Sequence, residues 1–252
     1  MNKLYIVATP IGNLEDISMR ALRILGEVDF ILCEDTRVTA KLLDHYNINT
    51  KKISYHQHSD EKKTKEIIEL LMEGKNLALV TDAGTPGISD PGGRLVAEAI
   101  KKLDSRIEVE SIPGPSAVTA ALSISGIPTD KFIFLGFPPH KKGRQTFLEQ
   151  ISNFVYPVVV YESKHRIIKF LEEIQTMNKG IEKYNKEIEV YNLNVNKKDR
   201  KEKKIPVTSV VVCRELSKMH ETVYRGELES IINKIKNNQD DQKGEFVVVI
   251  GK

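Results

Sequence analysis

The first half of the chain alternates short apolar runs with segments in which apolar residues recur every three or four positions. The runs are typical of buried strands, and the spaced pattern is typical of helices that bury one face. Strand-like runs occupy residues 4–8, 28–33, 53–55, 77–80 and 107–112. Strands that alternate with helices favour a largely parallel sheet that is covered by helices on both faces.

The pattern changes after residue 125, where the helical segments become fewer. Expected strands lie at residues 132–137, 157–162, 207–213, 221–225 and 246–250, and expected helices at residues 164–174 and 228–235. We expect several of these strands to be antiparallel. The sequence therefore predicts an α/β protein with two domains. Residues 1–125 would form an N-terminal, mostly parallel domain, and residues 126–252 a C-terminal mixed α/β domain.

Residues 177–204 differ from both domains because they are rich in Lys and Asn and show little periodicity. We expect them to form an excursion on the surface, with helical pieces at most. They contain nine Lys or Arg against five Asp or Glu, a net charge of +4 in a chain of net charge +3. The remainder of the chain therefore carries about −1. A nucleic-acid-binding surface outside this segment must be a local patch.

Two features bear on where the protein works. No apolar run approaches the roughly 20 residues that a membrane-spanning helix needs, and the chain begins with a strand-like run in place of a signal peptide. The two cysteines, Cys33 and Cys213, stand far apart in the sequence, which favours a reducing environment. We therefore expect a cytoplasmic protein that does not associate with a membrane.

The loop at residues 81–93, TDAGTPGISDPGG, is the clearest candidate for a binding site. It holds four glycines and two prolines between a strand-like run and a helical segment. Glycine lets a ligand approach the main chain closely, and ligands bind at the carboxyl ends of strands in open α/β sheets. Neither the dinucleotide fingerprint nor a complete P-loop is present. We predict a ligand loop of another kind, with a long surface turn as the alternative.

The sequence offers little for a metal ion. His56-Gln57-His58 resembles half of a metal site, but further ligands are not apparent nearby. We expect a polar loop there and no metal.

Seven stretches follow one another along the chain: residues 7–14 (VATPIGNL), 33–37 (CEDTR), 81–92 (TDAGTPGISDPG), 113–117 (PGPSA), 136–138 (GFP), 161–163 (YES) and 213–218 (CRELSK). In content and order they resemble the ribosomal RNA small subunit methyltransferase I family, which has the tetrapyrrole-methylase-like (class III) fold. The resemblance implies S-adenosyl-L-methionine as the cofactor, bound between the two domains. It further implies 2′-O-methylation of a cytidine in the decoding region of 16S rRNA, the 30S ribosomal subunit as partner, and a homodimer.

The chemistry of these loops fits that cofactor. Its amino-acid end needs hydrogen-bond donors and acceptors, which the backbone of residues 82–89 can supply. The hydroxyl of Ser116, at the start of the next helical segment, can supply a further hydrogen bond. We therefore expect the cofactor to contact Pro10, Gly12, Asn13, Asp82, Ala83, Gly84, Thr85, Gly87, Ile88, Ser89, Ser116 and Ala117.

The substrate site is less well determined by the sequence. A general base would have to be chosen among Asp35, Glu162, Glu215 and His220. We favour the cluster at residues 34–37, because two acids and an arginine can orient a hydroxyl and hold a phosphate. The alternative for this cluster is an ion pair that caps the next helix. The predicted catalytic residues are Asp35, Arg37, Glu162 and Glu215, and the predicted RNA contacts are Arg37, Arg214, Lys218 and Arg225.

Two other functions stay open at this point. A protein of the same fold could methylate a small tetrapyrrole-like substrate. A protein of another class could keep the loops without turnover and act in RNA binding or assembly, with the basic segment 177–204 as its main support.

Overall fold

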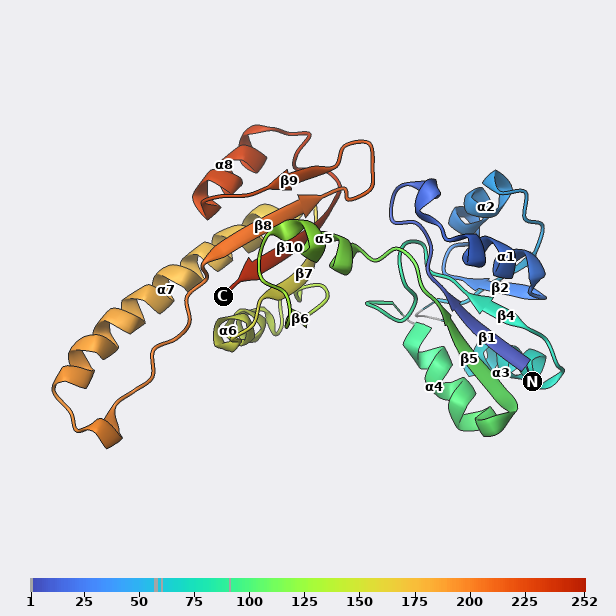
Figure 1. Cartoon of the computed structure of the whole chain (residues 1–252), viewed down its shortest axis with the longest axis horizontal. Helices are drawn as coiled ribbons and strands as arrows, with labels where there is room; N and C mark the ends of the chain where they lie inside the picture. The colour runs from blue at the N-terminus through green and yellow to red at the C-terminus, as the bar shows by residue number, and fades with distance from the viewer. Residues whose placement is uncertain (1, 57–58, 60, 91) are drawn as a thin grey trace. The chain divides into compact units, whose positions relative to one another are not determined.

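The computed structural model describes residues 2–56, 59, 61–90 and 92–252 (Figure 1). It divides into two compact units, Met1–Ala117 and Val118–Lys252. The division falls eight residues before the predicted one, because helix α5 (Ala117–Ser125) belongs to the second unit from its second residue onward. Among the described residues, no helix is long and apolar enough to cross a membrane.

The first unit is built on a five-stranded parallel sheet, as the alternation of strands and helices predicted. The strands are β1 (Asn2–Val7), β2 (Phe30–Cys33), β3 (Lys51–Ser54), β4 (Leu77–Leu79) and β5 (Ile107–Ile112). Their order is β3-β2-β4-β1-β5, with parallel pairing throughout. All five strands therefore end at the same edge of the sheet.

Helices cover both faces of this sheet. The helices are α1 (Met19–Glu27), α2 (Thr36–His45), α3 (Glu61–Met72) and α4 (Gly92–Leu103), with short 3-10 turns at Leu14–Asp16 (η1) and Asp104–Arg106 (η2). Buried residues of α1 and α2 pack with Ala78 and Val80, whereas those of α3 and α4 pack with Leu77 and Leu79. Alternate residues of one strand thus serve two separate cores.

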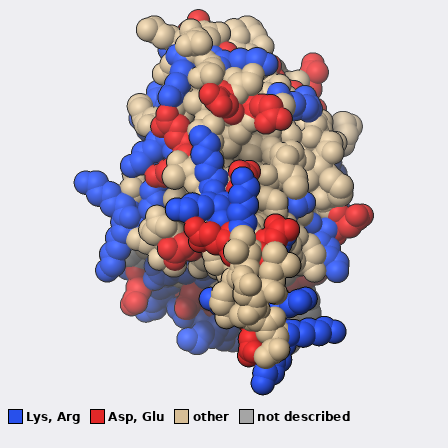
Figure 2. Space-filling view, turned by 90° about the vertical axis from the view of Figure 1, so that its left-hand side faces the viewer, with Lys and Arg blue, Asp and Glu red and all other residues tan. Residues whose placement is uncertain are grey.

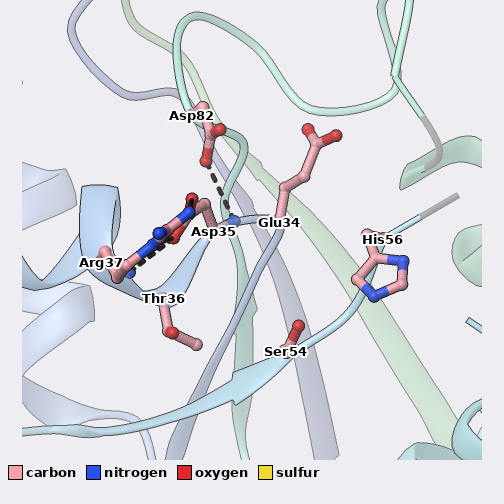
Figure 3. A pocket seen from close by; sticks show the side chains of 7 residues that line it. All are labelled: Glu34, Asp35, Thr36, Arg37, Ser54, His56 and Asp82. Atoms are coloured by element: carbon pink, nitrogen blue, oxygen red, sulfur yellow. Dashed lines mark hydrogen bonds and ion pairs between the residues drawn. The ribbon is translucent and has the colours of Figure 1, made fainter.

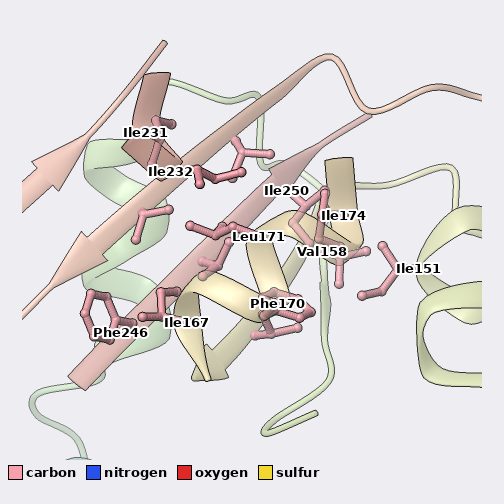
Figure 4. Close-up of a cluster of buried hydrophobic side chains, with 14 of the residues drawn as sticks. Ile151, Val158, Ile167, Phe170, Leu171, Ile174, Ile231, Ile232, Phe246 and Ile250 are labelled. Atoms are coloured by element: carbon pink, nitrogen blue, oxygen red, sulfur yellow. The ribbon is translucent and has the colours of Figure 1, made fainter. Parts of the chain in front are cut away.

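The second unit contains a mixed sheet. Its strands are β6 (Ile133–Phe134), β7 (Val158–Ser163), β8 (Ser209–Arg214), β9 (Thr222–Tyr224) and β10 (Glu245–Gly251). Their order is β6-β7-β10-β8-β9, and only the β6–β7 pair is parallel. Helices α6 (Arg144–Asn153), α7 (Ile167–Leu193) and α8 (Leu228–Asn237) share one core with this sheet, in which Phe170, Ile232 and Phe246 are buried (Figure 4).

Helix α7 corrects the prediction for residues 177–204. The expected helix at residues 164–174 continues to Leu193, so that more than half of the supposed irregular excursion is regular helix. A 3-10 turn at Lys197–Asp199 (η3) follows, and the chain then runs back beside α7 (Figure 1). The physical reason is a repeat of seven residues, visible in buried Ile174, Ile181 and Ile188, which the polar composition concealed.

Candidate active site

The loops that follow β1, β4 and β5 are joined to one another by hydrogen bonds. Thr9 and Gly84 exchange backbone hydrogen bonds of 2.9 and 3.0 Å. The hydroxyl of Thr9 also donates to the carbonyl of Thr81 at 3.0 Å, and that of Thr85 donates to the carbonyl of Pro115 at 3.2 Å. Residues predicted to bind the cofactor from three separate stretches of sequence therefore lie together at one edge of the sheet.

Glycine is required at two points of this arrangement. Gly84 has a φ of +85°, a left-handed backbone conformation that is strained for any residue with a side chain. A β-carbon at this position would point toward Ile11 and the carbonyl of Pro115. Gly92 begins α4, and a β-carbon there would lie 2.9 Å from Oδ1 of Asp90 and from the amide nitrogen of Gly87. The sequence pattern of the loop therefore reflects close packing of its own backbone.

Asp90 fixes the shape of the loop after β4. Its carboxylate accepts hydrogen bonds from the backbone N–H of Gly87 at 2.8 Å and of Gly92 at 2.6 Å. Asp90 therefore joins the middle of the loop, at Gly87, to the start of α4, at Gly92.

The remaining surface of these loops suits a ligand with both polar and apolar parts. Ala83 is exposed, and its backbone N–H and C=O make no hydrogen bond within the described part of the chain. The side chain of Ile88 is 49% exposed and offers an apolar surface to a ligand. The side chain of Asn13 is already engaged, because its oxygen accepts from the N–H of Glu15 and caps η1. The backbone of Ala83 and the side chain of Ile88 are thus available to a ligand.

A pocket of about 490 Å³ opens at the ends of β2, β3 and β4 (Figure 3). The seven residues that line it are all polar or charged: Glu34, Asp35, Thr36, Arg37, Ser54, His56 and Asp82. The backbone N–H of Asp35 donates to Oδ1 of Asp82 at 3.1 Å, which ties the pocket to the loop after β4. The predicted cluster at residues 34–37 therefore does line a pocket beside the predicted cofactor loop.

Within this pocket the carboxylate of Asp35 is fully engaged. It forms the N-cap of α2, where Oδ1 accepts from the backbone N–H of Arg37 at 2.8 Å. The Arg37 guanidinium donates to both carboxylate oxygens, at 3.0 and 2.6 Å. These hydrogen bonds hold the pKa of Asp35 well below its usual range. The capping ion pair that the sequence left open as the alternative is therefore present, and Asp35 is a weak candidate for the general base.

Glu34 is the stronger candidate. Its half-buried side chain points away from the Asp35–Arg37 pair, and its carboxylate makes no hydrogen bond or ion pair with the described residues (Figure 3). Burial raises the pKa of Glu34, and the nearby carboxylates of Asp82 and Asp90 raise it further. A carboxylate with a raised pKa takes up a proton more readily.

Ser54 and His56 were missed as pocket residues by the sequence reasoning. Their positions could have indicated this role, because Ser54 is the last residue of β3 and His56 follows two residues later, at the edge of the sheet where the other loops meet. His56 had been considered only as half of a metal site. Gln57 and His58 of that motif lie outside the described residues. Among the residues that are described, no group of three His, Cys, Asp or Glu could hold a metal ion.

Glu162 has a structural environment. Its side chain is fully buried, and Oε1 lies 2.9 Å from Arg166, with Oε2 at 3.9 Å from Arg144. Oε1 also accepts from the backbone N–H of Ser163 at 2.7 Å. Burial raises the pKa of Glu162 against the opposing effect of these donors. The geometry thus disfavours Glu162 as a catalytic group.

Arg214 is likewise buried. Its guanidinium donates to the backbone carbonyls of Lys243 at 2.7 Å, His220 at 3.0 Å and Asp240 at 2.6 Å. These hydrogen bonds hold together three backbone segments of the second unit. The N–H groups that form them are not available to a phosphate. We therefore give Arg214 a structural role in place of the predicted RNA contact.

The other predicted residues of the second unit lie near the surface. Lys218 forms ion pairs with Glu215 at 2.9 Å and with Glu245 at 2.8 Å. Arg225 is exposed and donates to the carbonyl of Ile124. The structure thus gives Glu215 a cationic partner, and Lys218 and Arg225 stay candidates for contacts with RNA.

Comparison with known proteins places this architecture in a family. The family model of the tetrapyrrole (corrin/porphyrin) methylases matches residues 3–232. A Synechocystis protein named ribosomal RNA small subunit methyltransferase I is 42% identical over 251 residues, which cover 99% of this chain and 79% of the relative. A Hydrogenobaculum protein of the same name is 41% identical, over 99% of this chain and 96% of the relative.

The fold is also that of solved structures with little sequence identity. A uroporphyrin-III C-methyl transferase from Thermus thermophilus, solved in complex with S-adenyl homocysteine, aligns with a TM-score of 0.60 at 17% identity, over 100% of this chain and 98% of that chain. The two-unit α/β architecture predicted from the sequence is thereby confirmed. The chain belongs to the tetrapyrrole methylase family and, within it, to the ribosomal RNA small subunit methyltransferase I proteins.

Proposed function

We propose that this protein transfers a methyl group from S-adenosyl-L-methionine to the 2′-hydroxyl of a cytidine in the decoding region of 16S rRNA. The observation that carries the proposal is the 42% identity, over 99% of the chain, with a protein named for methylation of small-subunit ribosomal RNA. The pocket beside the joined loops supports it, because ribose and phosphate groups are polar and every residue that lines the pocket is polar or charged.

The cofactor would be held by the loops after β1, β4 and β5. The free backbone groups of Ala83 can bind its amino-acid end, and the exposed Ile88 can pack against its adenine ring. The Thermus structure, whose title names S-adenyl homocysteine, supports a ligand of this chemistry on this fold. When bound, the cofactor supplies a sulfonium methyl group, and the new carbon–oxygen bond forms as the carbon–sulfur bond breaks.

The chain's own contribution is alignment of the hydroxyl and removal of its proton. The hydrogen bond between Asp35 and Asp82 keeps the pocket beside the cofactor loop, so that the hydroxyl can be held in line with the methyl group. The carboxylate of Glu34 accepts the proton that the hydroxyl loses, a contribution of roughly 10²–10⁴-fold to the rate. Arg37, whose side chain is 87% exposed, lies at the pocket where a phosphate of the substrate would pass.

The same proposal has two consequences for the protein in the cell. The substrate places it in the cytoplasm, where ribosomal subunits are assembled. The family resemblance further favours a homodimer, which sedimentation equilibrium at micromolar concentration would test.

The test uses radiolabelled S-adenosyl-L-methionine and three substrates: unmodified 30S subunits, deproteinised 16S rRNA and a uroporphyrin. Label at a single ribose 2′-oxygen of the RNA, located by nuclease digestion and mass spectrometry, is the expected result. A Glu34→Gln enzyme serves as the control for contaminating activity. Label on the porphyrin alone, or no label despite cofactor binding, would refute the proposal.

A further inference from the structure

Residues 177–207, which we term the arm, comprise the second half of α7, the turn η3 and the segment that runs back beside the helix. Three asparagines on α7 hold the returning segment. The carboxamides of Asn178, Asn185 and Asn192 bind the backbone of Val207, Lys204 and Lys201 respectively, each accepting from the N–H and donating to the C=O of the same residue. The six hydrogen bonds span 2.7–3.3 Å.

This ladder fixes the geometry of the returning segment. The asparagines are seven residues apart, which corresponds to about 10.5 Å along a helix. Their partners are three residues apart, so each residue of the segment must advance about 3.5 Å, close to the limit of an extended chain. The asparagines thus replace a partner strand, and they hold the backbone of residues 201–207 without any strand pairing.

The excess positive charge of the arm lies on the turn η3 and on the returning segment that follows it. The helical portion, residues 177–193, contains three Lys and three Glu, and is neutral. Residues 197–204 contain six Lys or Arg and two acids, a net charge of +4 within eight residues. The charge is therefore divided between residues 197–200, which include the turn and carry a net +2, and residues 201–204, which carry a net +2 and the rungs at Lys201 and Lys204.

The six cations of residues 197–204 fall into three groups. Lys201 and Lys204 lie over the rings of Tyr191 and Tyr184, at 4.8 and 5.5 Å from the centroids. Lys203 forms an ion pair with Glu189 at 3.3 Å. The third group lies at the end of the arm and forms no ion pair with the described residues: Lys197, Lys198 and Arg200. On the face that includes the end of the arm, Lys and Arg side chains project into solvent with acidic side chains between them (Figure 2).

We propose that the arm binds the phosphate backbone of RNA, with Lys197, Lys198 and Arg200 as its principal contacts. The proposal rests on the function proposed above and extends it to a second contact with the substrate. Charge complementarity is the reason: three cations without ion-pair partners stand together at the end of the arm, and the rung at Lys201 anchors the chain directly after them, which favours binding of a polyanion. Phosphate contacts position a protein on RNA without reading its sequence.

The first experiment measures binding to deproteinised 16S rRNA as a function of salt. Lys197→Gln/Lys198→Gln/Arg200→Gln should weaken binding at least tenfold at 0.1 M salt and reduce the slope of log K against log salt by about 2–3, since each phosphate contact contributes about 0.7–0.9. The matched control is Lys62→Gln/Lys101→Gln/Lys234→Gln, which removes the same charge from three separate exposed positions. An unchanged slope in the arm variant, or an equal loss in the control, would overturn the proposal.

The second experiment tests the ladder separately from the charge. Asn185→Leu/Asn192→Leu keeps every cation but removes the bonds to Lys201 and Lys204. We expect faster hydrogen exchange at those two amides and weaker RNA binding, with unchanged exchange in the sheet of the second unit. Faster exchange with undiminished RNA affinity would refute pre-organisation by the ladder.

Two further results distinguish binding of the arm to RNA from binding to a ribosomal protein. Val190→Ser/Leu193→Ser removes two apolar side chains, which are 62% and 80% exposed, and should leave RNA affinity unchanged. If the cation variant binds deproteinised 16S rRNA normally but fails to bind 30S subunits, the arm contacts a ribosomal protein and our proposal is wrong. If the wild type methylates the RNA and the variant of Lys197, Lys198 and Arg200 binds RNA as tightly as the wild type, only the proposed role of the arm is refuted. RNA binding that depends on the arm, without methylation, would refute the proposed reaction alone.

Discussion

The backbone N–H of Asp35 donates a hydrogen bond to Oδ1 of Asp82 across 3.1 Å, and so joins the start of α2 to the loop after β4. The first residue belongs to the proposed substrate pocket, and the second to the proposed cofactor loop. The alignment of hydroxyl and methyl group should therefore depend on this bond.

Replacement of Asp82 tests this connection. Asp82→Ala removes the acceptor and should lower kcat about tenfold, because hydrogen bonds to charged groups contribute about 1.5–3 kcal/mol. Asp82→Asn keeps an acceptor oxygen and should retain most of the activity. Steady-state kinetics on 30S subunits provide the measurement. Equal losses in both variants would show that the charge of Asp82 matters more than its bond to Asp35.

The proposed base makes the reaction depend on pH. Only the ionised form of Glu34 accepts a proton, and its pKa lies above the usual value because of burial and of Asp82 and Asp90. Turnover should therefore rise as the pH rises through the pKa of Glu34, and level off above it. Glu34→Gln should lower kcat by roughly 10²–10⁴-fold and abolish this limb of the profile, with cofactor affinity unchanged.

The same pH profile can be recorded for Asp35→Asn and His56→Gln as comparisons. Asp35 is committed to Arg37, so its variant should keep the ascending limb. Should the limb persist in Glu34→Gln and vanish in His56→Gln, the histidine would be the base and our choice of Glu34 would be wrong.

Two adjacent glycines offer a matched pair of variants. A β-carbon at Gly92 would lie 2.9 Å from the Asp90 carboxylate and the Gly87 nitrogen, whereas one at Gly93 would have no atom within 4 Å. Gly92→Ala should displace the loop and lower the affinity for S-adenosylhomocysteine about tenfold or more, a loss of at least about 1.4 kcal/mol in binding free energy. Gly93→Ala should bind normally and unfold at the same or a higher temperature, since alanine favours helix. Calorimetric titration and thermal unfolding give both quantities, and equal affinities would contradict the described packing.

Glu162 should be important for stability and not for chemistry. Glu162→Gln leaves the guanidinium of Arg166 without its buried counter-ion, which typically costs about 3–5 kcal/mol in the free energy of unfolding. Urea unfolding measures this loss. The control, Glu187→Gln, disturbs only an exposed pair and should change stability by about 0.5 kcal/mol or less. A stable Glu162→Gln protein that has lost its turnover would restore Glu162 to the active site.

The sequence predicted well whatever depends on local pattern and strand order. Alternating apolar runs gave the parallel sheet, and the glycine-rich loops had to meet because parallel strands end at one edge. What it could not predict was which charged group pairs with which. Asp35 and Glu34 are adjacent and chemically alike, yet only the fold determines that one caps α2 while the other stays free in the pocket.

The same limit explains the errors in the second unit. Glu162 and Arg214 look like surface charges in the sequence, and their burial follows from partners that are distant along the chain, such as the carbonyls of Asp240 and Lys243 that bind Arg214. The long helix was missed for a different reason. Its repeat is carried by isoleucine and asparagine together, and a search for apolar residues alone sees only part of it.

The ladder of the arm also restricts how such an element can evolve. Because each asparagine seven residues further along α7 binds a backbone residue three positions earlier, the two sides stay aligned only when they change together. Insertion or loss of a single residue on either side would shift every rung beyond it out of register. The arm can therefore lengthen or shorten in steps of ten residues, seven in the helix and three in the returning segment, and its reach is set in units of about 10.5 Å.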